Sequence, residues 1–112
     1  MGKMNVFVAD DISELNAERG YVPELKSLPN EVLTSSKPVV ELPPRKDFYF
    51  ISGDLITFDA AYLREVKRLQ PHSKFILTGD GMIGDIPEDL ATLFDERLPV
   101  VYPADLERVL RN

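Results

Sequence analysis

The sequence predicts an α/β fold, in which helices cover both faces of a parallel β-sheet. Short apolar runs rich in β-branched and aromatic residues recur along the chain, as expected for strands that are buried on both faces. From residue 47 onward, segments with apolar residues at helical spacing alternate with these runs, which favours βαβ units with right-handed crossovers. The chain has 112 residues, within the roughly 100–200 that are typical of one domain. We therefore expect residues 1–112 to form a single domain.

About five strands are predicted. The first apolar run ends abruptly at a pair of acids, and comparable runs follow it along the chain. The expected strands are residues 5–9, 31–34, 48–51, 75–78 and 100–102. Residues 39–42 are a rival for the second strand, but only five residues separate them from the third. A crossover between parallel strands needs about a dozen residues, so residues 31–34 are favoured.

Three helices are predicted after the third strand. Asp59 is a suitable N-cap for the first of them and Pro71 ends it, while Pro87 suits the first turn of the second. The expected helices are residues 59–70, 87–97 and 103–111. Nearer the N-terminus, a helix over roughly residues 12–18 is interrupted at Gly20.

The connection between the second and third strands is rich in proline. Pro38, Pro43 and Pro44 forbid a regular helix there, because proline lacks the N–H group that a helix needs and restricts the residue before it. The second helix of the fold is therefore expected to be missing or irregular. The whole pattern predicts a doubly wound three-layer sandwich.

Composition and charge exclude several classes of function. There is no cysteine and only one histidine, so zinc ribbons, disulfide frameworks and thiol catalysis are excluded, and only oxygen ligands remain for a metal. Nineteen acidic and thirteen basic residues give a net charge of −6, which makes nucleic acid an unlikely partner. No apolar stretch approaches the ~18 residues of a membrane span, and the start turns acidic too early for a signal peptide. We expect a cytoplasmic protein that does not enter membranes.

Acids and hydroxyls gather where the predicted strands end. Asp10 and Asp11 follow the first strand, Ser52 and Asp54 the third, and Thr78 ends the fourth. The carboxyl ends of parallel strands meet at one edge of the sheet, where α/β proteins bind ligands. Carboxylate and hydroxyl oxygens are the ligands that Mg²⁺ prefers, so the pair Asp10 and Asp11 could hold it. The alternative is that these acids only cap helices and loops.

These residues carry a resemblance to the receiver domains of response regulators. The resemblance spans nearly the whole chain and lies in VFVADD, in LREVKRLQPHSKFILTG and in VVYPADLERVL. It implies a flavodoxin-like fold and a role in two-component signal transduction. In that family an acid pair binds Mg²⁺ and an aspartate ending the third strand accepts a phosphoryl group. A Thr or Ser ends the fourth strand, and a lysine before a proline ends the fifth.

The chain departs from this family at two positions. Asp10, Asp11 and Thr78 carry over, but the third strand runs into Ser52, with Asp54 two residues further on. Tyr102 precedes a proline where the family has its lysine. Without a lysine, the negative charge of an acyl phosphate among carboxylates is poorly compensated. We therefore expect a pseudo-receiver that binds a protein partner without phosphorylation and requires no cofactor. The alternative within the family is a conventional receiver phosphorylated on Asp54.

A second family is also similar to part of the chain. The tail KFILTGDGMIGDIPEDLATLFDERLPVVYPADLERVL resembles the end of PIN-like ribonucleases, in which an aspartate follows a strand in a TGD-type turn and the first acid follows the first strand. On that reading Asp10, Asp59 and Asp80 would hold Mg²⁺ or Mn²⁺ and activate a water against a phosphodiester. The net charge of −6 disfavours this nuclease alternative.

The last strand and helix are the expected interaction surface. In receivers this part of the fold often carries dimer and partner contacts, and aromatic and arginine residues dominate binding hot spots. The residues expected at an interface with a protein partner or a second copy are Tyr102, Leu106, Arg108 and Arg111.

Overall fold

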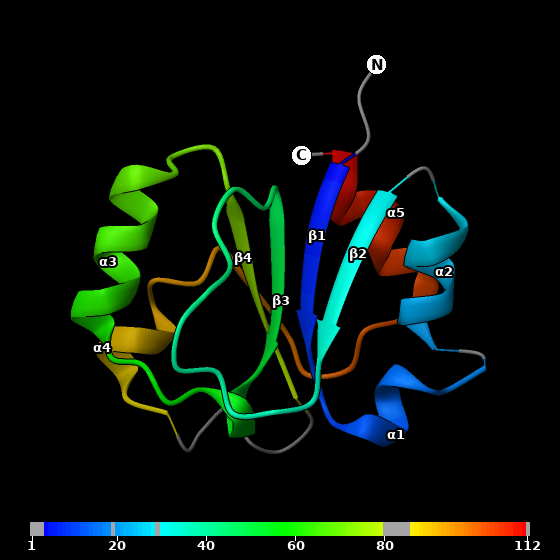
Figure 1. Cartoon of the computed structure of the whole chain (residues 1–112), viewed down its shortest axis with the longest axis horizontal. Helices are drawn as coiled ribbons and strands as arrows, with labels where there is room; N and C mark the ends of the chain where they lie inside the picture. Colours follow the sequence, from blue (N-terminus) through cyan, green and yellow to red (C-terminus); the bar gives the residue numbers. More distant parts are fainter. Residues whose placement is uncertain (1–3, 19, 29, 80–85, 112) are drawn as a thin grey trace.

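The computed structural model describes residues 4–18, 20–28, 30–79 and 86–111 and has a parallel five-stranded sheet at its centre (Figure 1). The strands are β1 (Met4–Ala9), β2 (Asn30–Ser35), β3 (Phe48–Ser52), β4 (Lys74–Thr78) and β5 (Glu96–Leu98). Their order in the sheet is β2-β1-β3-β4-β5, and every neighbouring pair is parallel. This is the flavodoxin-like order, in which strand order reverses between β1 and β3. The predicted fold class is confirmed.

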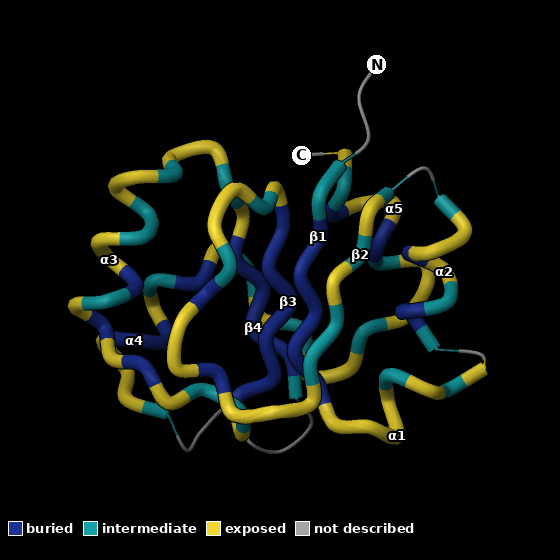
Figure 2. Tube along the Cα trace, viewed as in Figure 1, coloured by how far each residue is buried: buried dark blue, intermediate teal, exposed yellow. Residues whose placement is uncertain are grey.

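Helices cover both faces of the sheet. They are α1 (Ile12–Leu15), α2 (Tyr21–Ser27), α3 (Ala60–Leu69), α4 (Glu88–Ala91) and α5 (Pro103–Arg111), with a 3₁₀ turn at Gly53–Leu55. In Figure 1, α3 and α4 lie on one side of the sheet and α2 and α5 on the other. Figure 2 shows that the central strands are the most deeply buried part of the chain. The layers are therefore helix, sheet and helix.

Two hydrophobic cores form because successive residues of a strand point to opposite faces. Phe7, Tyr49 and Phe75 pack against α3 and α4, whereas Val8 and Phe50 pack against α2 and α5. The side chains of Tyr49 and Phe75 stack with their ring centres 4.7 Å apart. The same alternation decides which residues at the strand ends face α2.

The connection between β2 and β3 has no helix, as predicted. It crosses the face of the sheet that carries α3, where Val39 and Leu42 are buried in the core (Figure 1). Two tyrosine hydroxyls form hydrogen bonds with backbone groups of this connection. The hydroxyl of Tyr62 accepts a hydrogen bond from the Leu42 N–H at 2.8 Å, and Tyr49 donates to the Pro43 carbonyl at 2.6 Å. The predicted second strand at residues 31–34 is confirmed as part of β2, and residues 39–42 form no strand.

The fifth strand is the main correction. It was expected at residues 100–102 and lies instead at Glu96–Leu98, so the helix expected to reach residue 97 ends at Ala91. Asp95, just before this strand, forms two hydrogen bonds with Phe75: its side-chain carboxylate accepts from the Phe75 N–H, and its backbone N–H donates to the Phe75 carbonyl. Pro99 follows and cannot extend the ladder. The strand is at the sheet edge, so its charged residues Glu96 and Arg97 need not be buried.

The first connection also differs from expectation. The helix expected over residues 12–18 is a single turn, and a separate helix, α2, begins at Tyr21. Pro23 lies in the first turn of α2, where its missing N–H group costs no hydrogen bond. Among the helices of the described residues, none has the length and apolar character to span a membrane.

Candidate functional site

Three buried polar side chains form a row at the carboxyl ends of the three central strands. Asp10, Ser52 and Thr78 are 6%, 3% and 1% exposed, and they are the only buried polar residues in the part of the chain that the structure describes. Ser52 and Thr78 are paired in register, and Asp10 continues β1 beside them. All three extend the face that packs against α2, and they lie at the carboxyl ends of β1, β3 and β4, where the strand order reverses.

A cavity of about 330 Å³ opens above this row. The loop after β1 and the helices α1 and α2 contribute Asp11, Glu14 and Tyr21, and the segment after β5 contributes an apolar wall. The residues that line it are Asp10, Asp11, Glu14, Tyr21, Ser52, Asp54, Thr78, Gly79, Pro99, Val100 and Val101. Four are carboxylates, and none of these described residues is basic. The cavity is therefore strongly electronegative.

Asp10 is held by hydrogen bonds from inside the chain. The Tyr21 hydroxyl donates to Asp10 Oδ2 at 2.9 Å, and the Asp11 backbone N–H donates to Asp10 Oδ1 at 2.9 Å. Burial raises the pKa of Asp10, and the charges of Asp11 and Asp54 act in the same direction, while the two hydrogen bonds oppose the rise. Burial raises the pKa of Tyr21, and the charge of Asp10 and its hydrogen bond to the hydroxyl raise it further, so this hydroxyl stays a donor.

Asp11 and Glu14 occupy different environments from Asp10. Asp11 is exposed and caps α1, where its Oδ1 accepts from the Ser13 hydroxyl at 2.6 Å and from the Glu14 N–H at 2.9 Å. These hydrogen bonds, that of Ser13 first, lower the pKa of Asp11. The pKa of Glu14 is raised by partial burial and by the charges of Asp10 and Asp11. The alternative that these acids cap helices is therefore confirmed for Asp11.

Ser52 and Gly79 close the site between β3 and β4. The Ser52 hydroxyl donates to Asp54 Oδ1, so Asp54 is turned back toward the end of β3. Gly79 has a φ of +107°, and a Cβ at this position would lie 2.9 Å from Ser52 Oγ. Only glycine adopts this backbone conformation readily and fits beside the serine.

Thr78 differs from its neighbours in the row. Its Oγ1 is buried, lines the cavity and has no hydrogen-bond partner among the described residues. A buried hydroxyl without a partner costs about 1–3 kcal/mol, so such groups are rare in the interior of proteins. Thr78 therefore contributes a hydroxyl without a hydrogen bond to the cavity that the four carboxylates also line.

The structure brings together five of the residues that the sequence singled out, and it separates others. Asp10, Asp11, Ser52, Asp54 and Thr78 line one cavity. Tyr102 does not line it: it follows β5 by four residues and its side chain is 63% exposed. Because β5 lies at Glu96–Leu98, the residue that ends this strand before a proline is Leu98.

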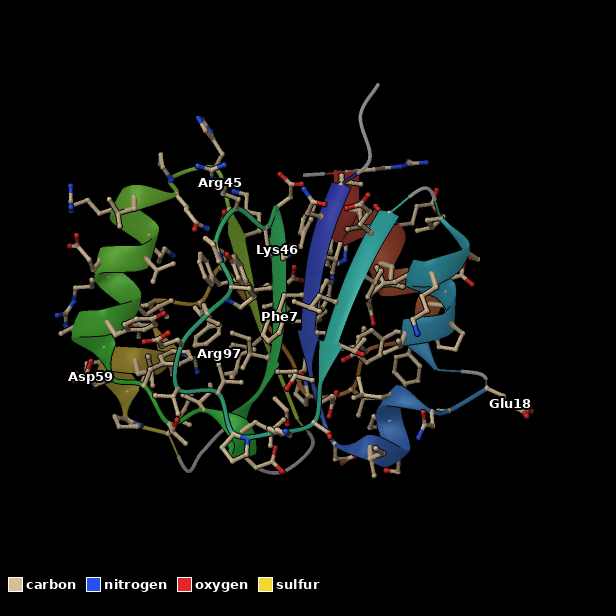
Figure 3. The ribbon with its side chains drawn as sticks, viewed as in Figure 1. Phe7, Glu18, Arg45, Lys46, Asp59 and Arg97 are labelled. Carbon is tan, nitrogen blue, oxygen red and sulfur yellow. The ribbon has the colours of Figure 1, made fainter. Side chains whose placement is uncertain are left out.

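The residues of the nuclease alternative do not share a site among the described residues. Asp59 caps α3 and lines a different depression, together with Asp54 and residues of α4. Figure 3 shows Asp59 at the start of α3, across the sheet from α1, the helix that follows Asp10 and Asp11. Asp80 lies outside the described residues. Over the described ranges, no three or more His, Cys, Asp or Glu side chains are grouped so as to hold a metal ion.

Two lining groups were not predicted from the sequence. Tyr21 lies eleven residues after Asp10, on a helix that the sequence pattern did not reveal, and Glu14 follows in α1. The apolar wall at Val100 and Val101 has the sequence pattern of a buried strand, which is why residues 100–102 are predicted as the fifth strand. An aromatic residue shortly after an acid pair was the only available signal, and it is not specific.

The expected interaction surface is partly buried. Leu106 is 1% exposed and belongs to the core between α5 and the sheet, so its side chain does not reach a partner. Tyr102, Arg108 and Arg111 are exposed. Arg108 pairs with Glu96 at 2.5 Å and Arg111 with Glu107 at 2.5 Å.

Comparison of the chain with models of known protein families and with curated protein sequences found no match.

Proposed function

We propose that the chain is a receiver-like signalling module that binds a protein partner and works without phosphorylation. The observation that carries this proposal is the hydrogen bonding of Asp10, whose two oxygens accept from Tyr21 and from the Asp11 N–H. In the family that the sequence resembles, this acid is free to bind Mg²⁺. Here a tyrosine hydroxyl satisfies it.

The positions that a phosphoryl group would need also support the proposal. The side chain that ends β3 is Ser52, a hydroxyl where the family has a carboxylate. Leu98 ends β5 before a proline, where the family has a lysine. No described residue of the cavity can therefore neutralise an acyl phosphate, and the four carboxylates would repel it.

A protein partner is supported by exposed apolar side chains at this edge of the molecule. Val100 lines the cavity and is exposed, Ile12 follows Asp11 directly, and Tyr102 follows two residues after Val100. Exposed large apolar and aromatic side chains are typical of binding surfaces.

The test is exposure to small phosphoryl donors. The chain is incubated with acetyl phosphate and Mg²⁺, and separately with beryllofluoride and Mg²⁺, and is followed by intact mass and by amide chemical shifts. We expect no added mass and no change of shifts at residues 10, 52 and 78. A phosphoryl adduct that is lost in Asp54→Asn and kept in the control Asp89→Asn would overturn the proposal and establish a conventional receiver.

A further inference from the structure

We propose that the cavity beside Asp10 binds the primary ammonium group of an alkyl chain, such as a lysine side chain or a free diamine. The lysine source rests on the proposed function, because it names the group that a protein partner would insert. Binding of the ammonium group itself does not depend on that function.

The negative charge of the cavity favours binding of a cation. Asp10, Asp11, Glu14 and Asp54 line a single space of about 330 Å³, with no base among its described lining residues. Burial raises the pKa values of Asp10 and Glu14, and repulsion from neighbouring acids adds to the rise. A cation held between them would relieve this repulsion, and the gain is larger in a partly enclosed space than in bulk water.

The Thr78 hydroxyl points to a ligand independently of the charge. Thr78 is 1% exposed and lines the cavity. Its Oγ1 makes no hydrogen bond of ordinary geometry in the described part of the chain, although it is near enough to the Tyr21 hydroxyl to oppose the rise in the pKa of that group. The Glu14 carboxylate lines the same cavity and is exposed. An ammonium group has three N–H donors and no acceptor, which matches an unused hydroxyl among carboxylates.

The geometry fits an ammonium group better than a metal ion. Both Asp10 oxygens accept hydrogen bonds from within the chain, and Asp11 Oδ1 accepts two. Among the described residues, no three acids are grouped so that they could bind a metal ion directly. A hydrated metal also gains nothing from an apolar wall. Pro99, Val100 and Val101 form such a wall, against which the methylene groups of an alkyl chain can lie while the charged end reaches the acids.

The acceptors also favour an ammonium group over a guanidinium group. Thr78 ends β4, Asp54 follows β3, and Glu14 comes from α1, so the acceptors come from three separate elements. A guanidinium group prefers a planar pair of oxygens on one carboxylate, whereas a compact ammonium group bonds in several directions.

The experiment titrates the whole chain with n-butylammonium chloride at neutral pH and follows backbone amide shifts. We expect saturable shifts at residues 10, 14, 52, 78 and 79 with affinity on the order of millimolar, as is usual for so small a ligand. Neutral n-butanol should produce none of them. Absence of saturable shifts, or equal shifts with butanol, would overturn the proposal.

Two further ligands test the choice of group. N-butylguanidinium and Mg²⁺ are titrated under the same conditions. Weaker binding of both at these residues supports the proposal, and binding of either one as tight as that of butylammonium would overturn it.

Two variants test the contributions of Thr78 and Glu14 to binding. Thr78→Val removes the unused hydroxyl and keeps the shape, and Glu14→Gln removes one charge. Each should weaken butylammonium binding by about tenfold, the effect usual for a hydrogen bond to a charged group. The control Glu31→Gln removes a charge on the exposed edge strand and should leave binding unchanged. Because a buried hydroxyl without a partner is costly, Thr78→Val should fold at least as stably as the wild type; unchanged binding in a folded Thr78→Val would contradict the proposal.

Two ligands separate the sources of the ammonium group. Cadaverine represents a free diamine, and the peptide acetyl-Ala-Val-Lys-Val-Ala-amide represents a partner, with norleucine replacing lysine in its control. Tighter binding of the lysine peptide than of cadaverine supports a partner lysine, and the reverse supports a free amine; both support the site, and binding of neither overturns it. Reaction with acetyl phosphate would instead overturn the proposed function and leave these titrations standing.

Discussion

The Tyr21 hydroxyl donates a hydrogen bond to Asp10 Oδ2 at 2.9 Å, and this contact joins α2 to the carboxyl end of β1. Asp10 is 6% exposed and Tyr21 is buried, so the contact is shielded from water. A buried carboxylate needs such partners, because desolvation of its charge is costly. The side chain of Asp10 is thereby held by the fold itself.

Replacement of Tyr21 by phenylalanine tests this contact. Tyr21→Phe leaves Asp10 Oδ2 without its donor, so we expect the free energy of unfolding to fall by about 1–3 kcal/mol, the cost of an unsatisfied buried group. Urea denaturation at pH 7 measures it. Tyr102→Phe is the matched control, because that side chain is exposed and its hydroxyl makes no hydrogen bond among the described residues. Equal midpoints for Tyr21→Phe and the wild type would show that the contact is unimportant.

The raised pKa of Asp10 predicts a pH-dependent cost of its charge. In the unfolded chain its pKa is near 3.8, and burial raises it in the folded state. The folded state then binds the proton more tightly, so stability from this group is lost as pH rises from 3.8 through the folded pKa. Asp10→Asn removes the charge. The variant also lacks one of the two oxygens that accept hydrogen bonds in the wild type, which lowers its stability at every pH. We therefore expect its urea midpoint, relative to that of the wild type, to be higher at pH 7 than at pH 4.

The complementary measurement uses an exposed acid. Asp89→Asn should show no comparable dependence, since Asp89 is exposed in the first turn of α4. A midpoint difference between Asp10→Asn and the wild type that is constant from pH 7 to pH 4 would argue against a buried charge as its cause.

The fold could be predicted from sequence because its central strands are continuous apolar runs. β1, β3 and β4 have residues buried on both faces, and prolines at positions 38, 43 and 44 left no room for a second helix. β5 could not be found in this way. Glu96 and Arg97 lie on an edge strand that is only partly buried, so its sequence carries no apolar run, whereas Val100 and Val101 form an apolar run that lines a cavity.

The part of the site that lies at the strand ends could be predicted from the sequence. Asp10, Ser52 and Thr78 follow apolar runs at positions of equal parity, which places them on one face. Tyr21 reaches Asp10 through a tertiary contact between α2 and β1, and no local pattern encodes such a contact. The expectation for Tyr102 was wrong in its placement because it depended on the misplaced fifth strand.

Gly79 is expected to be essential for the end of β4. Gly79→Ala forces a Cβ into a backbone with φ of +107° and to within 2.9 Å of Ser52 Oγ. We expect a loss of stability of about 1–3 kcal/mol, the usual cost of such strain, with amide shifts at Ser52 and Thr78. Gly20→Ala is the comparison, since Gly20 has an ordinary φ of −83°, and it should lose less. A wild-type midpoint for Gly79→Ala would refute the expectation.

The exposed residues at and just before α5 are expected to mediate self-association. Tyr102 and Arg111 are exposed, whereas Leu106 is buried in the core, so only the first two can contact a second copy of the chain. We expect Tyr102→Ala combined with Arg111→Glu to weaken self-association by about tenfold while the urea midpoint stays unchanged, because hot-spot residues combine exposure with large contact area. Sedimentation over a concentration series measures association. Leu106→Ala serves as the folding control and should lower stability by about 2–5 kcal/mol through the cavity it leaves. Self-association of the double variant at the wild-type strength, or a wild type that stays monomeric throughout the series, would rule out a homodimer through this surface.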